Sequence, residues 1–235
     1  MPLIASPRHT RADLEHWRRC ESMDDVYLAR CGAALDRREA EAADAIARFA
    51  DRPCYVGTSW GKDSIVVAHL ARESGLPLAW IRVAGVENPD CPFVRDAFLV
   101  RFPDVRYDEI EATSGAAKGK RTSAIGFAEA SRRHGDRYIS GVRAEESASR
   151  AMSAAVHGVA TDRACRPILR WSSVEVFAYL RRHDLPVHPA YACSMGGTLE
   201  RGRLRVGAIG GDRGTGRGRA EWERRYYPEI ARRDR

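Results

Sequence analysis

Apolar residues follow a helical period in the first fifty positions of the chain, and the rhythm changes after Pro53. Between residues 10 and 50 they recur every three or four positions in a segment rich in Ala, Arg and Glu, which predicts two or three helices. After Pro53, short apolar runs alternate with helical patterns. They predict strands at 54–58, 78–84, 105–110 and 137–141, and helices at 63–75, 91–101, 123–135 and 172–184.

This alternation predicts an α/β fold, a parallel twisted sheet with helices on both faces, preceded by amino-terminal helices. Ligands of such sheets bind at the carboxyl ends of the strands. The segment 194–219 is rich in Gly and Arg, and we expect it to form a long, mobile loop.

The first predicted strand runs into a turn of small residues at 59–64 (Ser-Trp-Gly-Lys-Asp-Ser) and then into a helix. Free backbone N–H groups and the helix dipole attract anions at such a junction, phosphate above all. Gly57 and Gly61 allow close approach of a ligand. Ser59 and Ser64 add hydroxyl donors, and Lys62 adds a charge. The spacing of a Walker loop is absent. The alternative is an ordinary turn capped by Ser and Asp side chains.

Composition narrows the class of protein. The chain has 235 residues, 44% of them hydrophobic, which suits one globular domain with a substantial core. We expect a cytoplasmic protein, because no run could span a bilayer and no signal-peptide core is present. The six cysteines are scattered without a Cys-x-x-Cys pair. This argues against zinc and against an iron–sulfur cluster, and it favours reduced thiols.

The formal net charge of +7 comes almost wholly from arginine, because Lys62, Lys118 and Lys120 are the only lysines. Arginines greatly outnumber acidic residues after position 200. Such a segment favours a phosphate-rich partner, either a nucleotide or a nucleic acid. A solvated arginine-rich surface is the alternative interpretation.

The turn at 59–64 resembles the Ser-Gly-Gly-x-Asp-Ser signature of the PP-loop ATP pyrophosphatases, with the Lys-Asp variant of the phosphoadenosine phosphosulfate (PAPS) reductase branch. Trp60 stands where the family has its first glycine. The resemblance implies an adenine nucleotide alpha hydrolase-like fold. It also implies a nucleotide site whose members are Thr58, Ser59, Trp60, Gly61, Lys62, Asp63, Ser64, Gly85, Gly141 and Arg143.

A second element, residues 141–150, reads Gly-Val-Arg-Ala-Glu-Glu-Ser-Ala-Ser-Arg and is similar to the family's Gly-[Ile/Leu]-Arg-x-x-x-Ser-x-x-Arg. Arg143 and Arg150 are therefore expected to contact phosphate, and the expected catalytic residues are Lys62, Asp63, Arg143 and Arg150. Glu145 and Glu146 could hold an arginine or Mg²⁺, or simply begin an exposed helix. The match of residues 85–91 to the family's pocket-bordering segment is loose, and a turn followed by a helix cap is the favoured interpretation there.

A third element, 167–180 followed by 185–191, resembles the family's Pro-Leu-x-x-Trp-[Ser/Thr] and Leu-Pro-x-[Asn/His]-Pro-x-Tyr segments. It is diagnostic rather than catalytic, with Ser172 and Glu175 forming a capping box. We expect a helical segment at 1–52, a PP-loop domain at 53–195, and an Arg/Gly-rich loop and carboxy-terminal helix at 196–235 packed on that domain.

The sequence departs from the reductases of this family, because their carboxy-terminal nucleophilic cysteine and cluster cysteines have no counterpart. Nucleotide α-phosphate chemistry remains, converting ATP to AMP and pyrophosphate with Mg²⁺ on the phosphates. In this the chain looks like the ATP pyrophosphatase component of DNA phosphorothioation systems. That resemblance implies DNA, a cysteine desulfurase and other modification-system proteins as partners.

Several alternatives stay open at this point. One is a PAPS or adenylyl-sulfate reductase with Cys193 as a displaced nucleophile, and another is a binding module without activity. The basic segment 201–225 would suit DNA or a protein partner, whereas Arg203, Arg205 and Arg213 could instead close over the nucleotide. The Ala-rich amino-terminal helices would allow a homodimer.

Overall fold

A computed structural model of the chain describes residues 1–83, 87–112, 122–207 and 219–231. Its centre is a five-stranded sheet in the order β3-β2-β1-β4-β5, and every pairing is parallel. The strands are β1 (Cys54–Thr58), β2 (Leu78–Val83), β3 (Tyr107–Ala112), β4 (Arg137–Ile139) and β5 (Ala164–Cys165). The chain crosses back to β4 beside β1, so β1 and β4 are neighbours whose carboxyl ends open at one edge.

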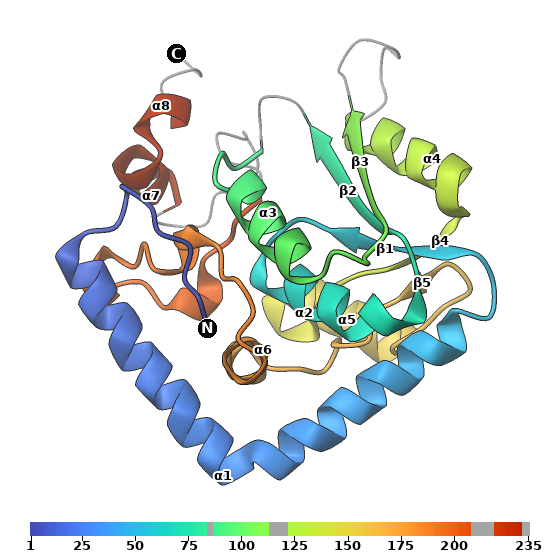
Figure 1. Cartoon of the computed structure of the whole chain (residues 1–235), viewed down its shortest axis with the longest axis horizontal. Coiled ribbons are helices and arrows are strands. Elements are labelled where there is room, and N and C mark those ends of the chain that lie inside the picture. The colour runs from blue at the N-terminus through green and yellow to red at the C-terminus, as the bar shows by residue number, and fades with distance from the viewer. Residues whose placement is uncertain (84–86, 113–121, 208–218, 232–235) are drawn as a thin grey trace.

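Helices connect these strands and follow them (Figure 1). The α-helices are α1 (Arg11–Phe49), α2 (Lys62–Ala71), α3 (Cys91–Arg101), α4 (Thr122–His134), α5 (Ala148–His157), α6 (Ser173–Arg182), α7 (Arg219–Tyr226) and α8 (Pro228–Ala231). Short 3₁₀ turns are η1 (Arg72–Ser74), η2 (Ala144–Glu146), η3 (Pro189–Tyr191), η4 (Met195–Gly197) and η5 (Arg201–Arg203).

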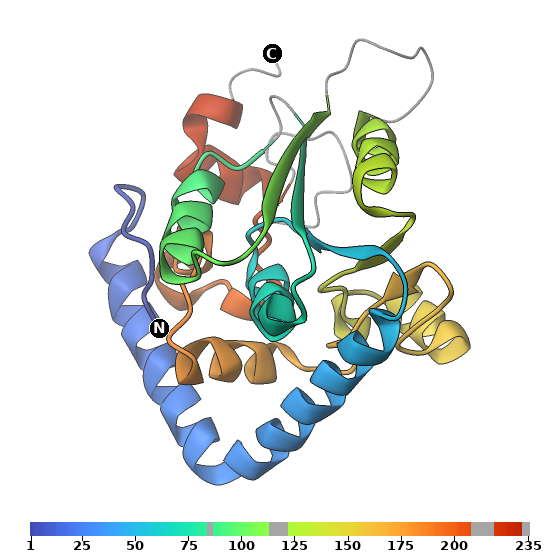
Figure 2. The ribbon, with the colours of Figure 1, turned by 45° about the vertical axis from the view of Figure 1, so that its right-hand side comes forward.

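The two faces of the sheet carry different cores. Tyr55, Ala79 and Ile110 on one face form a small cluster with Ala130 of α4. The other face belongs to the main core, which includes α2, α3, α6 and part of α1. Figure 2 shows α4 and α2 on opposite sides of the strands. The predicted α/β class, with a parallel sheet and helices on both faces, is therefore confirmed.

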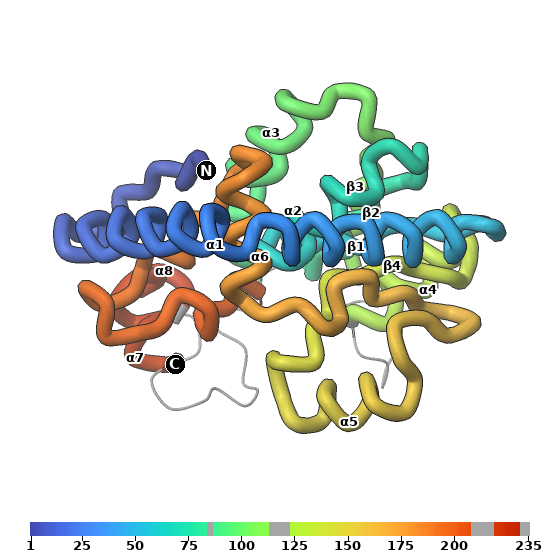
Figure 3. The backbone as a smooth tube through the Cα atoms, turned by 90° about the horizontal axis from the view of Figure 1, so that it is seen from below, coloured from blue at the N-terminus to red at the C-terminus, as the bar shows by residue number. Residues whose placement is uncertain are grey.

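The amino-terminal segment differs from the prediction of two or three helices, because α1 is one helix of 39 residues. It bends about midway into a V (Figure 1) and runs across the whole molecule when seen from below (Figure 3). Gly32 lies in this helix, and the Arg182 guanidinium donates to its carbonyl oxygen at 3.1 Å. Arg181 pairs with Asp25, and Arg182 also pairs with Asp36. An inserted donor at a glycine is a recognised cause of a helix bend.

Other predicted elements agree closely. The strand at 54–58 and the helix at 91–101 have the predicted bounds, and Ser172 with Glu175 caps α6 as a capping box. The prediction missed α5, whose residues were assigned only to a motif, and β5, which has two residues and depends on its pairing with β4. Among the described residues, no helix combines the length and apolar character that crossing a bilayer requires.

In the described part of the loop predicted at 194–219, the chain is irregular apart from η4 and η5, and distant residues hold it in place. Ser194 N–H donates to Asp13, Met195 N–H donates to Tyr226 Oη, and Arg201 pairs with the buried Asp24. Partners on α1 and α7 hold this segment, and a local reading of its Gly and Arg content could not reveal them. Lys118, Lys120 and Arg213 lie outside the described residues.

Candidate functional site

A cavity of about 1110 Å³ opens where the carboxyl ends of β1 and β4 meet the start of α2. Its wall combines the turn after β1, the segment after β4, one side of α5 and residues 202–207. Several apolar side chains, from the sheet and from α4, line another part: Ala79, Ile81, Phe127 and Tyr138. The cavity lies at the sheet edge that the sequence predicts for a ligand.

The turn at 59–64 is held by the Ser64 hydroxyl. Ser64 Oγ donates to the Gly61 carbonyl at 2.9 Å and accepts the Ser59 N–H at 3.2 Å. Gly61 is the N-cap of α2, and no Ser or Asp side chain of the turn caps this end. The alternative of an ordinary turn capped by Ser and Asp side chains is therefore not what the structure shows. A helix N-terminus that faces a cavity offers amide donors to an anion.

Trp60 occupies the position at which the PP-loop signature that this turn resembles has its first glycine. Its φ of 58° lies in the left-handed region, where a glycine would be unstrained. The side chain is fully buried, with ring centroids 5.8 Å from Phe98, 5.8 Å from Tyr107 and 6.3 Å from Trp80. The structure places this side chain in the core, and Trp60 is not among the residues that line the cavity.

Lys62, Asp63 and Arg143 form a compact charged network. The Asp63 carboxylate accepts from Lys62 Nζ at 2.6 Å and from Arg143 Nε at 2.6 Å. Arg143 is almost fully buried and also donates to the carbonyl of Trp171 at 3.1 Å. Burial lowers the pKa of Lys62, and the nearby Arg143 adds to this effect, although Asp63 opposes it. Two of the predicted catalytic cations therefore hold Asp63 in place.

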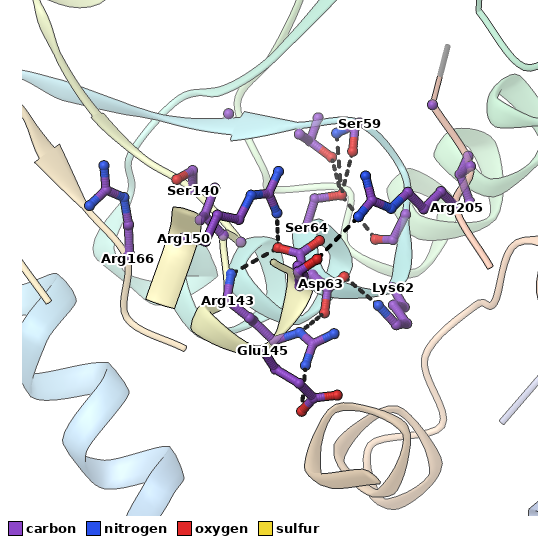
Figure 4. Close-up of a pocket in the computed structure, with 18 of the residues that line it drawn as sticks. Ser59, Lys62, Asp63, Ser64, Ser140, Arg143, Glu145, Arg150, Arg166 and Arg205 are labelled. Atoms are coloured by element: carbon purple, nitrogen blue, oxygen red, sulfur yellow. Dashed lines mark hydrogen bonds and ion pairs between the residues drawn. The ribbon is translucent and has the colours of Figure 1, made fainter. Parts of the chain in front are cut away.

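A second group of cations faces the cavity with fewer partners (Figure 4). Arg150 pairs with Glu146, and Arg205 donates to the Glu146 carbonyl at 3.2 Å. Within the described ranges, neither Arg166 nor Arg205 has an acidic side chain within 4.0 Å. The pKa of Arg150 is lowered by burial, and the charges of Arg205, Arg143 and Arg166 contribute. Guanidinium groups that crowd one another in this way favour an anion between them.

Ser140 and Gly141 complete the wall at the end of β4. Ser140 Oγ is buried, and no hydrogen-bond partner is found for it among the described residues. A Cβ at Gly141 would lie 2.6 Å from the Asp63 carbonyl carbon, so only glycine lets these two segments approach. A buried hydroxyl without a partner is unfavourable, and a ligand in the cavity would satisfy it.

Most of the predicted nucleotide-binding residues come together here. The following line the cavity: Thr58, Ser59, Gly61, Lys62, Asp63, Ser64, Gly141, Arg143 and Arg150. Trp60 does not, and Gly85 lies outside the described residues. The prediction missed Ser140 and Arg166, which carry no motif, and Tyr191, which was treated only as a diagnostic residue.

The remaining candidates have defined positions. Glu145 pairs with Arg143, so holding an arginine is the alternative observed for these two glutamates. Arg203 and Arg205 line the cavity. Asp90 is the N-cap of α3, but its carboxylate accepts from Tyr227 instead of capping the helix. Cys193 is fully buried, and burial raises the pKa of its thiol, which opposes its use as a nucleophile.

Comparison with known proteins agrees with the motifs that follow residue 100. The sequence profile of the phosphoadenosine phosphosulfate reductase domain matches residues 103–197, less than half of the chain. A phosphoadenosine 5'-phosphosulfate reductase of Synechococcus sp. is 46% identical over 55 residues. That stretch is 23% of this chain and 23% of the relative, so less than a quarter of the relative's length is matched.

Two solved structures are similar at low sequence identity. Phosphoadenylyl-sulfate reductase from Candida auris has a TM-score of 0.43 at 14% identity, covering 66% of this chain and 87% of that chain. NMN synthetase from Francisella tularensis has a TM-score of 0.44 at 16% identity, covering 65% and 70%. The profile match supports the resemblance to PAPS reductases for the segments around Arg143, Arg150 and Tyr191, and the turn at 59–64 lies outside the matched profile.

Proposed function

We propose that this chain binds an adenine nucleotide by its phosphates and catalyses substitution at the α-phosphorus, converting ATP to AMP and pyrophosphate. The observation that carries the proposal is the convergence of Arg150, Arg166 and Arg205 on one cavity at the start of α2. Negative charge builds on the leaving pyrophosphate in such a reaction, and fixed guanidinium groups stabilise it.

The chain's own residues divide into two roles. The amides of the turn, with Ser59 and Ser64, would hold the β and γ phosphates, while Arg150, Arg166 and Arg205 would balance the charge. Lys62 and Arg143 would act through Asp63, which they hold at 2.6 Å each. The apolar slot beside Phe127 and Tyr138 would accept the flat nucleobase.

Mg²⁺ would enter as part of the nucleotide complex. Among the described residues, no group of three or more metal-binding side chains is arranged for a metal, and the carboxylates of Asp63, Glu145 and Glu146 are held by arginines. Phosphate oxygens and water supply the hard ligands that Mg²⁺ prefers, and its chemistry there is charge neutralisation.

The acceptor proposed for the activated phosphate is DNA, in sulfur modification of its backbone, with a cysteine desulfurase and other modification-system proteins as partners. The basic residues that follow position 200 support a polyanionic partner. Because Arg205 lines the cavity, part of that segment would serve the nucleotide rather than DNA. A homodimer through the Ala-rich α1 remains a prediction.

The second candidate function is reduction of PAPS or adenylyl sulfate, which the family match at 103–197 favours. It requires a thiolate beside the nucleotide. Within the described part of the chain, no cysteine lines the cavity, and Cys193 is fully buried. This observation favours the ATP reaction over the reductase.

The deciding experiment measures pyrophosphate release from Mg·ATP by the native chain and by Ser64→Ala, with and without DNA. Ser74→Ala is the matched control, because Ser74 Oγ donates to the Ala71 carbonyl beyond the other end of α2. We expect release that is lost in Ser64→Ala, retained in Ser74→Ala and increased by DNA. Thioredoxin-dependent sulfite release from PAPS, without pyrophosphate release from ATP, would establish the reductase instead. Binding without turnover of either substrate would indicate a binding module.

A further inference from the structure

Tyr191 reaches the phosphate-binding turn from a distant part of the chain. It lies in η3, and only 3% of the residue is exposed. Its Oη accepts the Lys62 backbone N–H at 3.1 Å, which is the first amide of α2. A Cβ at Gly61 would lie 3.1 Å from this same Oη, and Tyr191 is among the residues that line the cavity. The hydroxyl is therefore next to the place where a phosphate oxygen would bind.

The proton of this hydroxyl has no acceptor within the described ranges. A phenol can accept and donate at once, yet Lys62 N–H is the one hydrogen-bond partner of Oη found there, and it uses an acceptor site. Burial raises the pKa of Tyr191, and the Asp63 carboxylate nearby adds to this, so the oxygen keeps its proton. A buried O–H without an acceptor is unfavourable, and buried tyrosines normally find a partner.

We infer that Tyr191 is a phosphate-contacting residue, whose hydroxyl is oriented by the Lys62 amide and donates its proton to a phosphate oxygen of the bound nucleotide. This inference rests on the proposed function for its ligand, an adenine nucleotide carrying a chain of phosphates.

A second contact fixes the same element against the turn. The His188 ring accepts the Ala190 N–H at Nδ1, while its Nε2 lies 3.7 Å from Cys91 Sγ. Cys91 Sγ lies 3.7 Å from the Ser59 carbonyl oxygen. Residues 188–191 thus support the turn near both of its ends, at Ser59 and at Lys62. Because these contacts hold residues 188–191 in place, the Tyr191 hydroxyl is preorganised for its ligand.

The test measures binding rather than turnover alone. Tyr191→Phe is compared with the native chain by calorimetric titration with Mg·ATP and with inorganic pyrophosphate. The matched control is Tyr179→Phe, which removes another buried hydroxyl, bonded to His69 at 2.6 Å and absent from the cavity wall. We expect binding of both probes to weaken at least about tenfold in Tyr191→Phe and to be unchanged in Tyr179→Phe, since hydrogen bonds to charged groups are the strong ones.

Gly61→Ala gives an independent test if Tyr191→Phe does not fold. Its new methyl presses on Oη, and we expect it to weaken pyrophosphate binding as well. Unchanged or tighter binding by Tyr191→Phe would overturn the inference, because the hydroxyl would then be structural or a competitor for the Lys62 amide. If the native chain binds the probes but releases no pyrophosphate, only the proposed reaction is refuted. If the native chain binds neither probe, the proposed function and this inference are both refuted.

Discussion

Replacing Trp60 with glycine removes backbone strain from the turn at 59–64 and also removes a buried side chain from the core. The left-handed backbone, with φ of 58°, costs a residue with a side chain about 1–2 kcal/mol, and glycine removes that strain. Truncating a fully buried Trp costs about 3–5 kcal/mol, and its three aromatic neighbours place it toward the upper end. The net expectation is a loss of about 2–4 kcal/mol of unfolding free energy.

Urea denaturation at neutral pH would measure this loss, and for a chain of this size the midpoint of thermal unfolding would fall by roughly 5–15 °C. Trp60→Ala is the matched control, because it removes the same side chain but keeps the left-handed penalty. It should be about 1 kcal/mol less stable than Trp60→Gly. Mg·ATP binding should survive in Trp60→Gly, because the Trp60 side chain does not line the cavity. A glycine variant as stable as the native chain, or equal stability of the two variants, would refute the reasoning.

Three further predictions concern the charged groups. Arg143→Met should lower the unfolding free energy by about 3–5 kcal/mol and abolish pyrophosphate release, because Asp63 loses a buried partner. In urea denaturation the control is Arg163→Met, which removes an exposed arginine that pairs with Asp136. Arg205→Ala should weaken Mg·ATP binding about five- to tenfold and reduce its salt dependence without lowering the unfolding midpoint; equal binding in titrations at two salt concentrations would contradict this. Burial lowers the pKa of His69 and of His188 to about 3, so the unfolded chain binds more protons below pH 6.5. The contribution of these two histidines to the unfolding free energy should therefore be complete above pH 6.5 and fall toward pH 3, by up to about 1.4 kcal/mol per pH unit for each histidine. His188→Asn should make that decrease less steep in denaturation measured between pH 7 and 5.

Much of the fold could be predicted from local signals in the sequence. The strand at 54–58 and the helix at 91–101 were predictable because an apolar run or helical spacing ends at clear breakers. The capping box at Ser172 and Glu175 spans four positions, so no tertiary contact is needed to recognise it. The single bent α1 was not predictable, because the Arg182 guanidinium at Gly32 comes from 150 positions away.

The candidate site could be predicted only in part, because several of its contacts join residues that are far apart in the sequence. The sequence indicated an anion-binding turn at 59–64 and two arginines near it, since the residue types and their order carry that chemistry. Only the tertiary structure shows which cations hold Asp63 and which face the cavity. Arg143 lies 80 positions from Asp63 and is buried against it, and Tyr191 lies 129 positions from Lys62, whose backbone N–H its hydroxyl accepts.

What the sequence determined by itself was the α/β class and the place of the turn at 59–64, because strand and helix periodicity and the turn's small residues are local properties. What only the tertiary structure decided was the burial of Trp60, the role of Arg143 in holding Asp63, and the approach of Tyr191, Arg166 and Arg205 to the cavity. Burial and hydrogen-bond partners depend on which distant segments pack together, and no local pattern encodes that choice.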